Sequence, residues 1–224
     1  SQLEIPPANL GSLRVAVVHD WLTGMRGGES ALEHILTLVP NSQLFTLMHT
    51  SGSVSAQIES HRPRHTFVQY LPFSRTRYRN YLPFFPAAIE QLDLDDYDIV
   101  ISTSHCAAKA AISTGRARHL CYCFTPMRYA WDQFDAYFGV EQVGQWQSSL
   151  YRMAMTRLAR WDTATAGRVD RYVAISQYVA SRIGRYYNRE AEVIYPPVDT
   201  SFYRPNGSKS RGYFVVVSAL VPYK

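Results

Sequence analysis

The sequence predicts an α/β protein whose doubly wound parallel sheet is Rossmann-like. Three observations support this fold class: short apolar runs alternate with segments of helical periodicity, the first run is rich in Val, and a glycine-rich turn leads from it into a helix. Strands buried on both faces of a parallel sheet have nearly continuous apolar sequences, and the intervening helices provide the crossovers that parallel pairing requires.

The first β-α-β unit opens the predicted domain. Residues 13–20 (LRVAVVHD) have the pattern of a buried strand, and residues 30–39 (SALEHILTLV) carry apolar side chains at helical spacing. Pro40 ends the helix, because proline lacks the backbone N–H that a continuing helix needs. Residues 42–50 (SQLFTLMHT) then predict the second strand.

The later elements follow the same alternation. Ser176 has a side chain suited to capping the helix that we expect after it. Residues 61–86 interrupt the alternation with an irregular, basic and aromatic stretch that contains several prolines. The remaining predicted strands are residues 97–104, 116–124, 169–176 and 191–199, and the remaining predicted helices are residues 146–169 and 177–187.

The chain divides into four predicted parts. Residues 1–12 are a flexible leader, and residues 13–204 form the Rossmann-like domain. Residues 205–212 (PNGSKSRG) are a polar linker. Residues 213–224 are a new apolar run that we expect to be the first strand of a truncated second domain, so we interpret the chain as a fragment or a truncated gene product.

The composition predicts a folded protein. Hydrophobic residues make up 46% of the 224 residues and charged residues 18%, which is typical of a globular chain. The 16 Tyr suit a sugar or headgroup site, or equally half-buried packing. No apolar run reaches the roughly 18 residues of a bilayer span, and no signal peptide is recognisable. We therefore expect a cytoplasmic protein, with peripheral attachment to the inner face of the plasma membrane as a further possibility.

The three cysteines, Cys106, Cys121 and Cys123, predict neither a disulfide framework nor a metal site. They are odd in number and lack the spacing of zinc ligands, which favours a reducing compartment. We expect Cys121 and Cys123 to be buried small apolar residues on opposite faces of one strand, unable to share a metal.

The first candidate site is the turn that contains Gly24, Gly27 and Gly28. A helix that begins on glycines presents free backbone N–H groups at the positive end of its dipole, and the missing Cβ atoms let a phosphate approach closely. Arg26 between the glycines also favours an anion. The spacing matches neither G-x-G-x-x-G nor the P-loop, so a tight corner without a ligand is an equally good interpretation.

The second candidate is His105, which follows the predicted strand 97–104 at the edge where open α/β sheets bind ligands. A histidine there can hydrogen-bond a hydroxyl or transfer a proton, or it can be a structural residue bonded to the backbone. Lys109 lies four residues further on, and we expect it to point into the same crevice if a helix begins near Cys106.

The third candidate is the loop 125–132, which follows the predicted strand 116–124. Arg128 offers an anion ligand, Trp131 a stacking face and Asp132 a hydrogen-bond acceptor, which are groups that a sugar site uses. The alternative is that Trp131 anchors the core and that Arg128 and Asp132 form an ion pair within a helix.

The fourth candidate is the basic and aromatic stretch 61–86, in which Arg75, Arg77 and Arg79 are interleaved with Phe and Tyr. Such a surface can lie on an anionic bilayer with its rings at the interface, or it can be an ordinary solvated face. Nucleic acid is the least favoured partner, and we expect none.

Six segments of the chain carry a family resemblance, in the right order from residue 13 to the end. The segments are VAVVHDWLTGMRGGE, ISTSHCAAK, CYCFTPMRYAWD, VDRYVAISQYVASRI, VIYPPVD and VSALVPYK. Together they resemble the retaining GT-B glycosyltransferases of family four, the group 1 transferases, and the nearest resemblance is to their mannosyltransferase-like branch. The set is specific as a whole, although no single motif is.

The resemblance implies a two-domain enzyme that needs no metal or other cofactor, with this chain as its acceptor-binding N-terminal GT-B domain. Gly27 and Gly28 look like the loop that approaches the donor phosphates, and His105 matches a histidine near the transferred sugar. Lys224 is similar to a lysine that neutralises the diphosphate leaving group. The implied partners are a nucleotide sugar, with GDP-mannose preferred, and a glycan or lipid-linked acceptor in cell-surface polysaccharide synthesis.

Three departures from the family pattern bear on activity. Phe124 stands where family members usually have a second histidine, and Ala219 where an arginine often precedes the phosphate lysine. The paired glutamates of the donor motif have no counterpart, so we expect the chain to be inactive alone. The alternative function is a non-catalytic module that binds glycan or membrane. A Rossmann-type oxidoreductase is disfavoured because no G-x-G-x-x-G follows the first strand.

Overall fold

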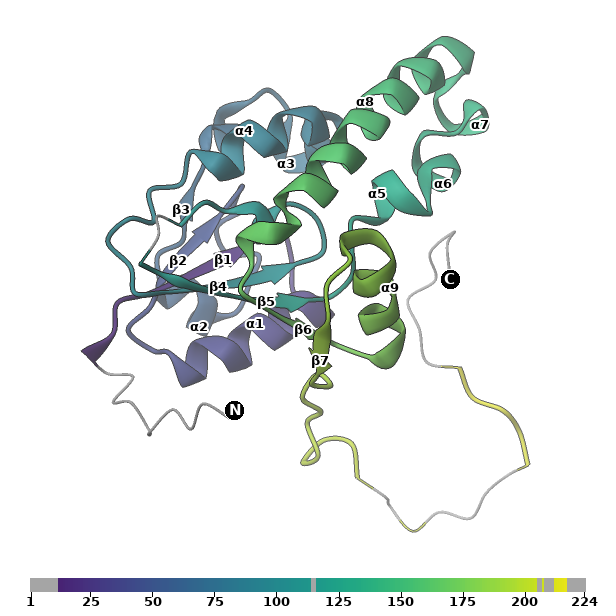
Figure 1. Ribbon diagram of the computed structural model, residues 1–224. Helices are drawn as coiled ribbons and strands as arrows, with labels where there is room; N and C mark the ends of the chain where they lie inside the picture. The colour runs from purple at the N-terminus through teal and green to yellow at the C-terminus, as the bar shows by residue number, and fades with distance from the viewer. Residues whose placement is uncertain (1–11, 114–115, 205–206, 208–211, 217–224) are drawn as a thin grey trace.

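The protein is built on a seven-stranded sheet, seen in a computed structural model that describes residues 12–113, 116–204, 207 and 212–216 (Figure 1). Every strand pair is parallel, and the strand order is β3-β2-β1-β4-β5-β6-β7. This confirms the predicted α/β class with a doubly wound sheet. The strands are β1 (Val15–His19), β2 (Gln43–Thr46), β3 (Arg64–His65), β4 (Ile99–Ser104), β5 (Arg118–Cys123), β6 (Arg171–Ala174) and β7 (Ala191–Val193).

Helices cover both faces of the sheet, with α1 and α2 below it and α4 and α8 above it in Figure 1. The α-helices are α1 (Gly27–Leu38), α2 (Ala56–Ser60), α3 (Ser74–Arg77), α4 (Phe85–Glu90), α5 (Arg128–Trp131), α6 (Phe134–Phe138), α7 (Val140–Val143), α8 (Gln145–Ala164) and α9 (Gln177–Tyr187). The 3-10 helices are η2 (Phe67–Tyr70), η3 (Tyr78–Phe84), η4 (Ala108–Ala110) and η5 (Thr165–Arg168).

The central strand β1 shows why its sequence is an unbroken apolar run. Successive side chains of a strand point to opposite faces of the sheet, and in β1 both faces are buried. Val15 and Val17 pack in the cluster that contains the apolar residues of α1, whereas Ala16 and Val18 pack in the cluster beneath α4 and α8. All five residues of β1 are therefore shielded from water.

The strand order reverses between β1 and β4: strands β2 and β3 are added on one side of β1, and β4 to β7 on the other. From β1 the chain runs through β2 to the edge strand β3, then returns to pair β4 with the free side of β1 and continues through β5 to β7. The loops that follow β1 and β4 consequently lie next to each other at the carboxyl ends of the two strands. Open α/β sheets bind their ligands at such a switch point.

Most predicted elements are confirmed, with shifted ends. Helix α1 begins at Gly27, three residues before the predicted start, so the glycines belong to its first turn. Helix α9 has the predicted bounds, and the Ser176 side chain caps it by accepting the N–H of Val179 at 3.2 Å. The predicted helix 146–169 is α8 followed by η5. The short strand β3 and the helices between residues 61 and 86 were not predicted.

The prediction that Cys121 and Cys123 point to opposite faces is wrong. Residues two positions apart on a strand share a face, and both cysteines pack in the cluster formed with α9. The prediction that they are buried is confirmed, and both are free thiols.

The predicted start of a second domain is only partly visible. Residues 213–216 are exposed and lie in no strand of the described chain, and residues 217–224, with Ala219 and Lys224, lie outside the described residues. In the part of the chain that is described, no helix combines the length and the hydropathy needed to cross a bilayer.

Candidate functional site

Asp20 joins the ends of the two central strands. Its carboxylate lies directly after β1, is fully buried, and accepts four backbone N–H groups from the segment after β4. The distances are 2.6 Å from His105, 2.9 Å from Cys106, 2.6 Å from Ala107 and 2.7 Å from Ala108. A carboxylate surrounded by backbone N–H groups is stabilised in its ionised form. Asp20 therefore fixes the loop that carries His105.

His105 is held by the same carboxylate through its side chain. Its Nδ1 lies 3.0 Å from Asp20 Oδ2, and the edge of its ring meets the Trp21 ring at a centroid distance of 4.3 Å. The side chain is 22% exposed, and Nε2 makes no hydrogen bond within the described chain. Burial alone would raise the pKa of Asp20, but the charge and hydrogen bonds of His105 lower it to about 2. The geometry thus presents one oriented imidazole nitrogen at the switch point.

His19 is a second, more deeply buried imidazole in the same place. Its Nδ1 lies 2.7 Å from Thr103 Oγ1, whereas its Nε2 lies 3.9 Å from Glu29 Oε1 and has no hydrogen-bond partner in the described chain. Burial raises the pKa of Glu29, but the neighbouring His19 outweighs this and lowers it. Glu29 also accepts the N–H of Arg26 at 3.1 Å, which ties the first turn of α1 to this histidine.

The glycine turn leaves the start of α1 open. Gly24 has φ +154°, and a Cβ at Gly27 would meet no atom within 4 Å. A Cβ at Gly28 would lie 3.5 Å from the Phe124 ring and 3.8 Å from His19, so this glycine faces the switch point. The first N–H groups of a helix have no acceptor within the helix, and those of Gly27 and Gly28 find none elsewhere in the described chain.

Phe124, directly after β5, packs against both histidines. Its ring centroid is 6.4 Å from that of His19 and 6.4 Å from that of His105. Phe124 therefore adds an apolar wall to the site and offers no hydrogen bond there.

The prediction that Lys109 points into this crevice is wrong. Lys109 is buried in η4, where its Nζ donates to the Asp162 carbonyl at 2.6 Å and to Thr165 Oγ1 at 3.1 Å, and lies 3.1 Å from Asp162 Oδ1. Trp131 Nε1 and the Tyr187 hydroxyl donate to the same carboxylate at 2.8 and 3.0 Å. We call Asp162 with these three side chains, Lys109, Trp131 and Tyr187, the Asp162 hub. The alternative interpretation of Trp131 as an anchor of the core agrees with this geometry.

Asp132, directly after α5, contacts two side chains of helix α9. It forms an ion pair with Arg182 and accepts the Tyr186 hydroxyl at 2.6 Å. The Trp131 ring stacks on the Tyr186 ring at a centroid distance of 4.5 Å. Arg128 begins α5 and is half-buried. These contacts give the loop after β5 a structural connection to α9.

The three arginines of the predicted membrane surface are not equivalent. Arg75 and Arg77 are exposed, whereas Arg79 is half-buried, with Nε 3.3 Å from the Tyr129 hydroxyl and its guanidinium 5.1 Å from the Tyr78 ring centroid. Arg79 is therefore committed to packing, and only Arg75 and Arg77 are presented to a partner.

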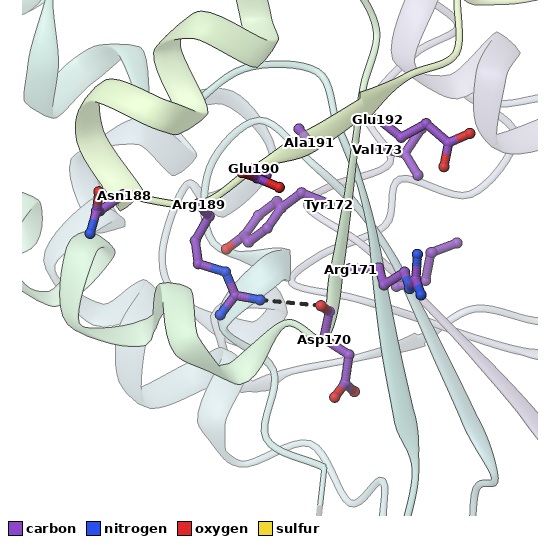
Figure 2. A pocket seen from close by; sticks show the side chains of 10 residues that line it. Asp170, Arg171, Tyr172, Val173, Asn188, Arg189, Glu190, Ala191 and Glu192 are labelled. Carbon is purple, nitrogen blue, oxygen red and sulfur yellow. Dashed lines mark hydrogen bonds between the residues drawn. The ribbon is translucent and has the colours of Figure 1, made fainter. Parts of the chain in front are cut away.

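One hollow lies away from the switch point. A cavity of about 570 Å³ opens where β6 and β7 begin, and its walls mix acidic and basic side chains such as Asp170, Arg171, Arg189 and Glu192 (Figure 2). The carbonyl of Asp170 accepts Arg189 Nη2 at 3.1 Å, which closes one wall. Such balanced charges favour no particular class of ligand. The part of the chain that is described also contains no cluster of three or more His, Cys, Asp or Glu suited to a metal.

Sequence reasoning located the glycine turn and His105 but missed Asp20, His19, Glu29 and Asp162. One signal was available: Asp20 and His19 are polar residues at the end of the first strand, where the switch point lies. No comparable signal marked Asp162, which is an ordinary position of a long helix.

Comparison with known proteins adds a family. No curated protein matches the chain significantly. The structure of an E. coli heptosyltransferase, WaaC with ADP, aligns over 83% of this chain and 74% of that chain at 15% identity with a TM-score of 0.24, too low to support a structural argument. The family model of Glycosyltransferase Family 4 matches residues 43–202, which is most of the chain. The chain therefore belongs to Glycosyltransferase Family 4.

Proposed function

We propose that the chain is the acceptor-binding half of a retaining hexosyltransferase. In this proposal the chain is inactive alone and works together with the donor-binding domain that the family resemblance implies. The pair transfers mannose from GDP-mannose to a glycan or lipid-linked acceptor, at the inner face of the plasma membrane, in cell-surface polysaccharide synthesis. Family membership supports a nucleotide sugar and an acceptor as substrates. The observation that carries the proposal further is His105, oriented by buried Asp20 beside the open start of α1.

The start of α1 is the proposed site for the donor diphosphate. The backbone N–H groups of Gly27 and Gly28 have no acceptor in the described chain, and a helix N-terminus carries a partial positive charge. The missing Cβ of Gly27 opens onto free space, so a phosphate oxygen can reach the backbone. His19, whose buried Nε2 has no partner among the described residues, is a further donor at this place when Nε2 carries a proton.

His105 is the proposed contact to the transferred sugar. In the neutral ring Nδ1 donates to Asp20, which leaves Nε2 as an acceptor for a sugar hydroxyl. As the bond from the anomeric carbon to the diphosphate breaks, negative charge builds on the leaving phosphate. We propose that the N–H groups at α1 and Lys224 stabilise that charge, and that the leaving phosphate takes the proton of the acceptor hydroxyl, without a metal.

Acceptor recognition is proposed for the surface beyond the loop after β5. Trp131 and Asp132 already bind Asp162 and Arg182, so we propose that they shape this surface while Arg128 at the start of α5 contacts the acceptor. Lys109 has no part in this proposal.

The diphosphate site can be tested without turnover. Titration of the chain with GDP, followed by backbone NMR, is expected to shift the amide signals of Gly27 and Gly28 most. Gly27→Val should abolish these shifts, because its side chain enters the open space, while Gly184→Ala on α9 is the matched control. Unchanged GDP shifts in Gly27→Val would overturn the diphosphate site. Transfer from GDP-mannose by the two-domain enzyme that the resemblance implies, compared with GDP-glucose and UDP-glucose, then tests the donor.

A further inference from the structure

The outward face of α8 carries a row of residues that the fold does not use. Trp146, Leu150 and Met153 are 91%, 64% and 68% exposed. The spacing of three and four residues continues along the helix through positions that are all exposed, and it keeps them on one face over about 27 Å at 1.5 Å per residue. We call this row the α8 stripe; its members are Trp146, Leu150, Met153, Arg157, Arg160 and Ala164.

The opposite face of α8 already anchors the helix. Ser148, Met155, Leu158 and Asp162 are buried there, and Met155 and Leu158 belong to the main core cluster. The N-terminal half of α8 extends beyond the sheet beside α6 and α7 (Figure 1). The three large apolar side chains of the stripe are therefore not needed for packing, and they keep a row of apolar surface in water.

The charges of α8 divide the stripe into two halves. Its N-terminal half is apolar, and its C-terminal half carries Arg157 and Arg160, which form no ion pair within the described chain. The single carboxylate of the helix, Asp162, is buried on the other face. Arg152, also exposed, adds a positive charge beside the stripe and pairs with Asp135 at 3.3 Å. An apolar segment continued by unpaired arginines is complementary to an anionic bilayer.

We propose that the α8 stripe binds an anionic lipid bilayer. Trp146, Leu150 and Met153 lie at the boundary between headgroups and acyl chains, and Arg157 and Arg160 contact anionic headgroups. A second copy of the chain fits less well. In a parallel dimer the arginines of the two stripes would face each other and repel. In an antiparallel dimer the arginines of one stripe would face the apolar half of the other. The proposal extends the membrane part of the proposed function but does not depend on sugar transfer.

A shallow hollow adjoins the basic end of the stripe. It encloses about 500 Å³ and is mostly apolar, and Arg160 and Ala164 belong both to its wall and to the stripe. Trp131 forms its far side. An acyl chain can therefore occupy this hollow next to Arg160, which we assign to an anionic headgroup.

The test uses the full chain and sucrose-loaded vesicles, without nucleotide sugar. We expect sedimentation with vesicles of phosphatidylcholine and phosphatidylglycerol, and a blue shift of tryptophan emission that is much reduced in Trp146→Phe, since Trp146 is 91% exposed and Trp21 is buried. Trp131 and Trp161 are partly buried, and each donates a hydrogen bond to a carboxylate, so their contribution to the shift is smaller. Leu150→Ser with Met153→Ser, and separately Arg157→Glu with Arg160→Glu, should each weaken partitioning about tenfold or more.

Two controls make the outcome decisive. Leu38→Ser on α1 removes a leucine that is 73% exposed and should bind like the unaltered chain. Arg75→Glu with Arg77→Glu tests the other basic surface. The proposal is overturned if the α8 variants bind normally, if vesicles of phosphatidylcholine alone bind equally well, or if the stripe instead mediates dimerisation that the leucine and methionine changes abolish. Because no sugar donor is present, failure of the transferase proposal leaves this result unaffected.

Discussion

Asp20 and Asp162 are both fully buried aspartates, yet they are satisfied in opposite ways. Four backbone N–H groups and one half-exposed histidine surround Asp20. Side chains from α5, α9 and η4 surround Asp162, and all of them are hydrogen-bonded or ion-paired to it. The first arrangement ends in an imidazole that faces the switch point, whereas the second is closed.

The difference distinguishes a carboxylate that positions a functional side chain, Asp20, from one that stabilises the packed core, Asp162. Backbone N–H groups are held by the fold itself, so Asp20 fixes a loop and still leaves His105 Nε2 for a substrate. The Asp162 hub needs its carboxylate to balance a buried ammonium, because an unpaired charge in the interior is costly. The same residue type thus supports the proposed site in one place and the scaffold in the other, and four substitutions test this distinction.

The largest effect is expected for Asp162→Ala. This change leaves the buried Lys109 ammonium without its counter-ion and deprives Trp131 and Tyr187 of their acceptor. Loss of one partner from a buried ion pair costs about 3–5 kcal/mol of unfolding free energy. Urea denaturation measures it, and Asp135→Ala, which removes an exposed carboxylate, should stay within about 0.5 kcal/mol.

A double substitution sharpens this prediction. If the cost of Asp162→Ala comes from the stranded charge, Lys109→Met combined with Asp162→Leu should be more stable than Asp162→Ala alone. A single variant that loses less than about 1 kcal/mol would show that the Asp162 hub contributes little to stability.

A smaller, pH-dependent effect is expected for Asp20→Asn. The pKa of Asp20 is lowered from 3.8 to about 2, so its stabilisation is complete above pH 3.8 and is lost as the pH falls toward 2. The difference corresponds to roughly 2 kcal/mol at about 1.4 kcal/mol per unit. Denaturation between pH 4 and 2 should show this loss in the unaltered chain and a flatter profile in Asp20→Asn.

His119 provides an internal control at higher pH, between 6.5 and 4. Burial lowers the pKa of His119 from 6.5 to about 4, so its protonation destabilises the fold as the pH falls from 6.5 to 4. This loss should remain in Asp20→Asn. If Asp20→Asn changed the stability profile near pH 6 and not below pH 4, Asp20 could not be the buried carboxylate that stabilises the fold in its ionised form.

Trp131→Phe should cost about 1 kcal/mol of unfolding free energy. The phenyl ring can keep the stack on Tyr186, while the hydrogen bond from Nε1 to Asp162 is lost, and such a bond contributes about 0.5–1.5 kcal/mol. The measurement is again urea denaturation. A matched change, Tyr187→Phe, removes another donor to the same carboxylate, and a cost near zero for both would argue against a cooperative hub.

The sequence predicted the fold class and most strands because their signals are local, but it missed the short elements β3 and α3. The apolar run of β1, the helical spacing of α1 and the cap at Ser176 each follow from neighbouring residues. The candidate site was only half predictable. The glycines and His105 are recognisable in place, but Asp20 acts on N–H groups that lie 85 to 88 positions further along the chain.

The misplacement of Lys109 has the same physical origin. Its partner Asp162 lies 53 positions away in a helix whose local pattern gives no reason to expect a buried carboxylate. The local sequence around a lysine near a strand end does not reveal whether its side chain faces a ligand or an aspartate far away in the chain. Only the tertiary packing of η4 against η5 and the end of α8 decides between them.

The sharpest test of the comparison belongs to His105→Ala. Asp20 loses one charged partner, but the side chain is partly exposed and the four backbone hydrogen bonds to Asp20 survive the change, so the unfolding free energy should fall by only about 1 kcal/mol. In the two-domain enzyme that the resemblance implies, transfer of mannose should fall by about a hundredfold, because the oriented nitrogen is lost. GDP release with acceptor present measures this, and Tyr187→Phe, which removes a hydrogen bond of the Asp162 hub, should lose stability without losing transfer. A His105→Ala variant that unfolds readily yet transfers normally would place His105 with the scaffold, alongside the Asp162 hub.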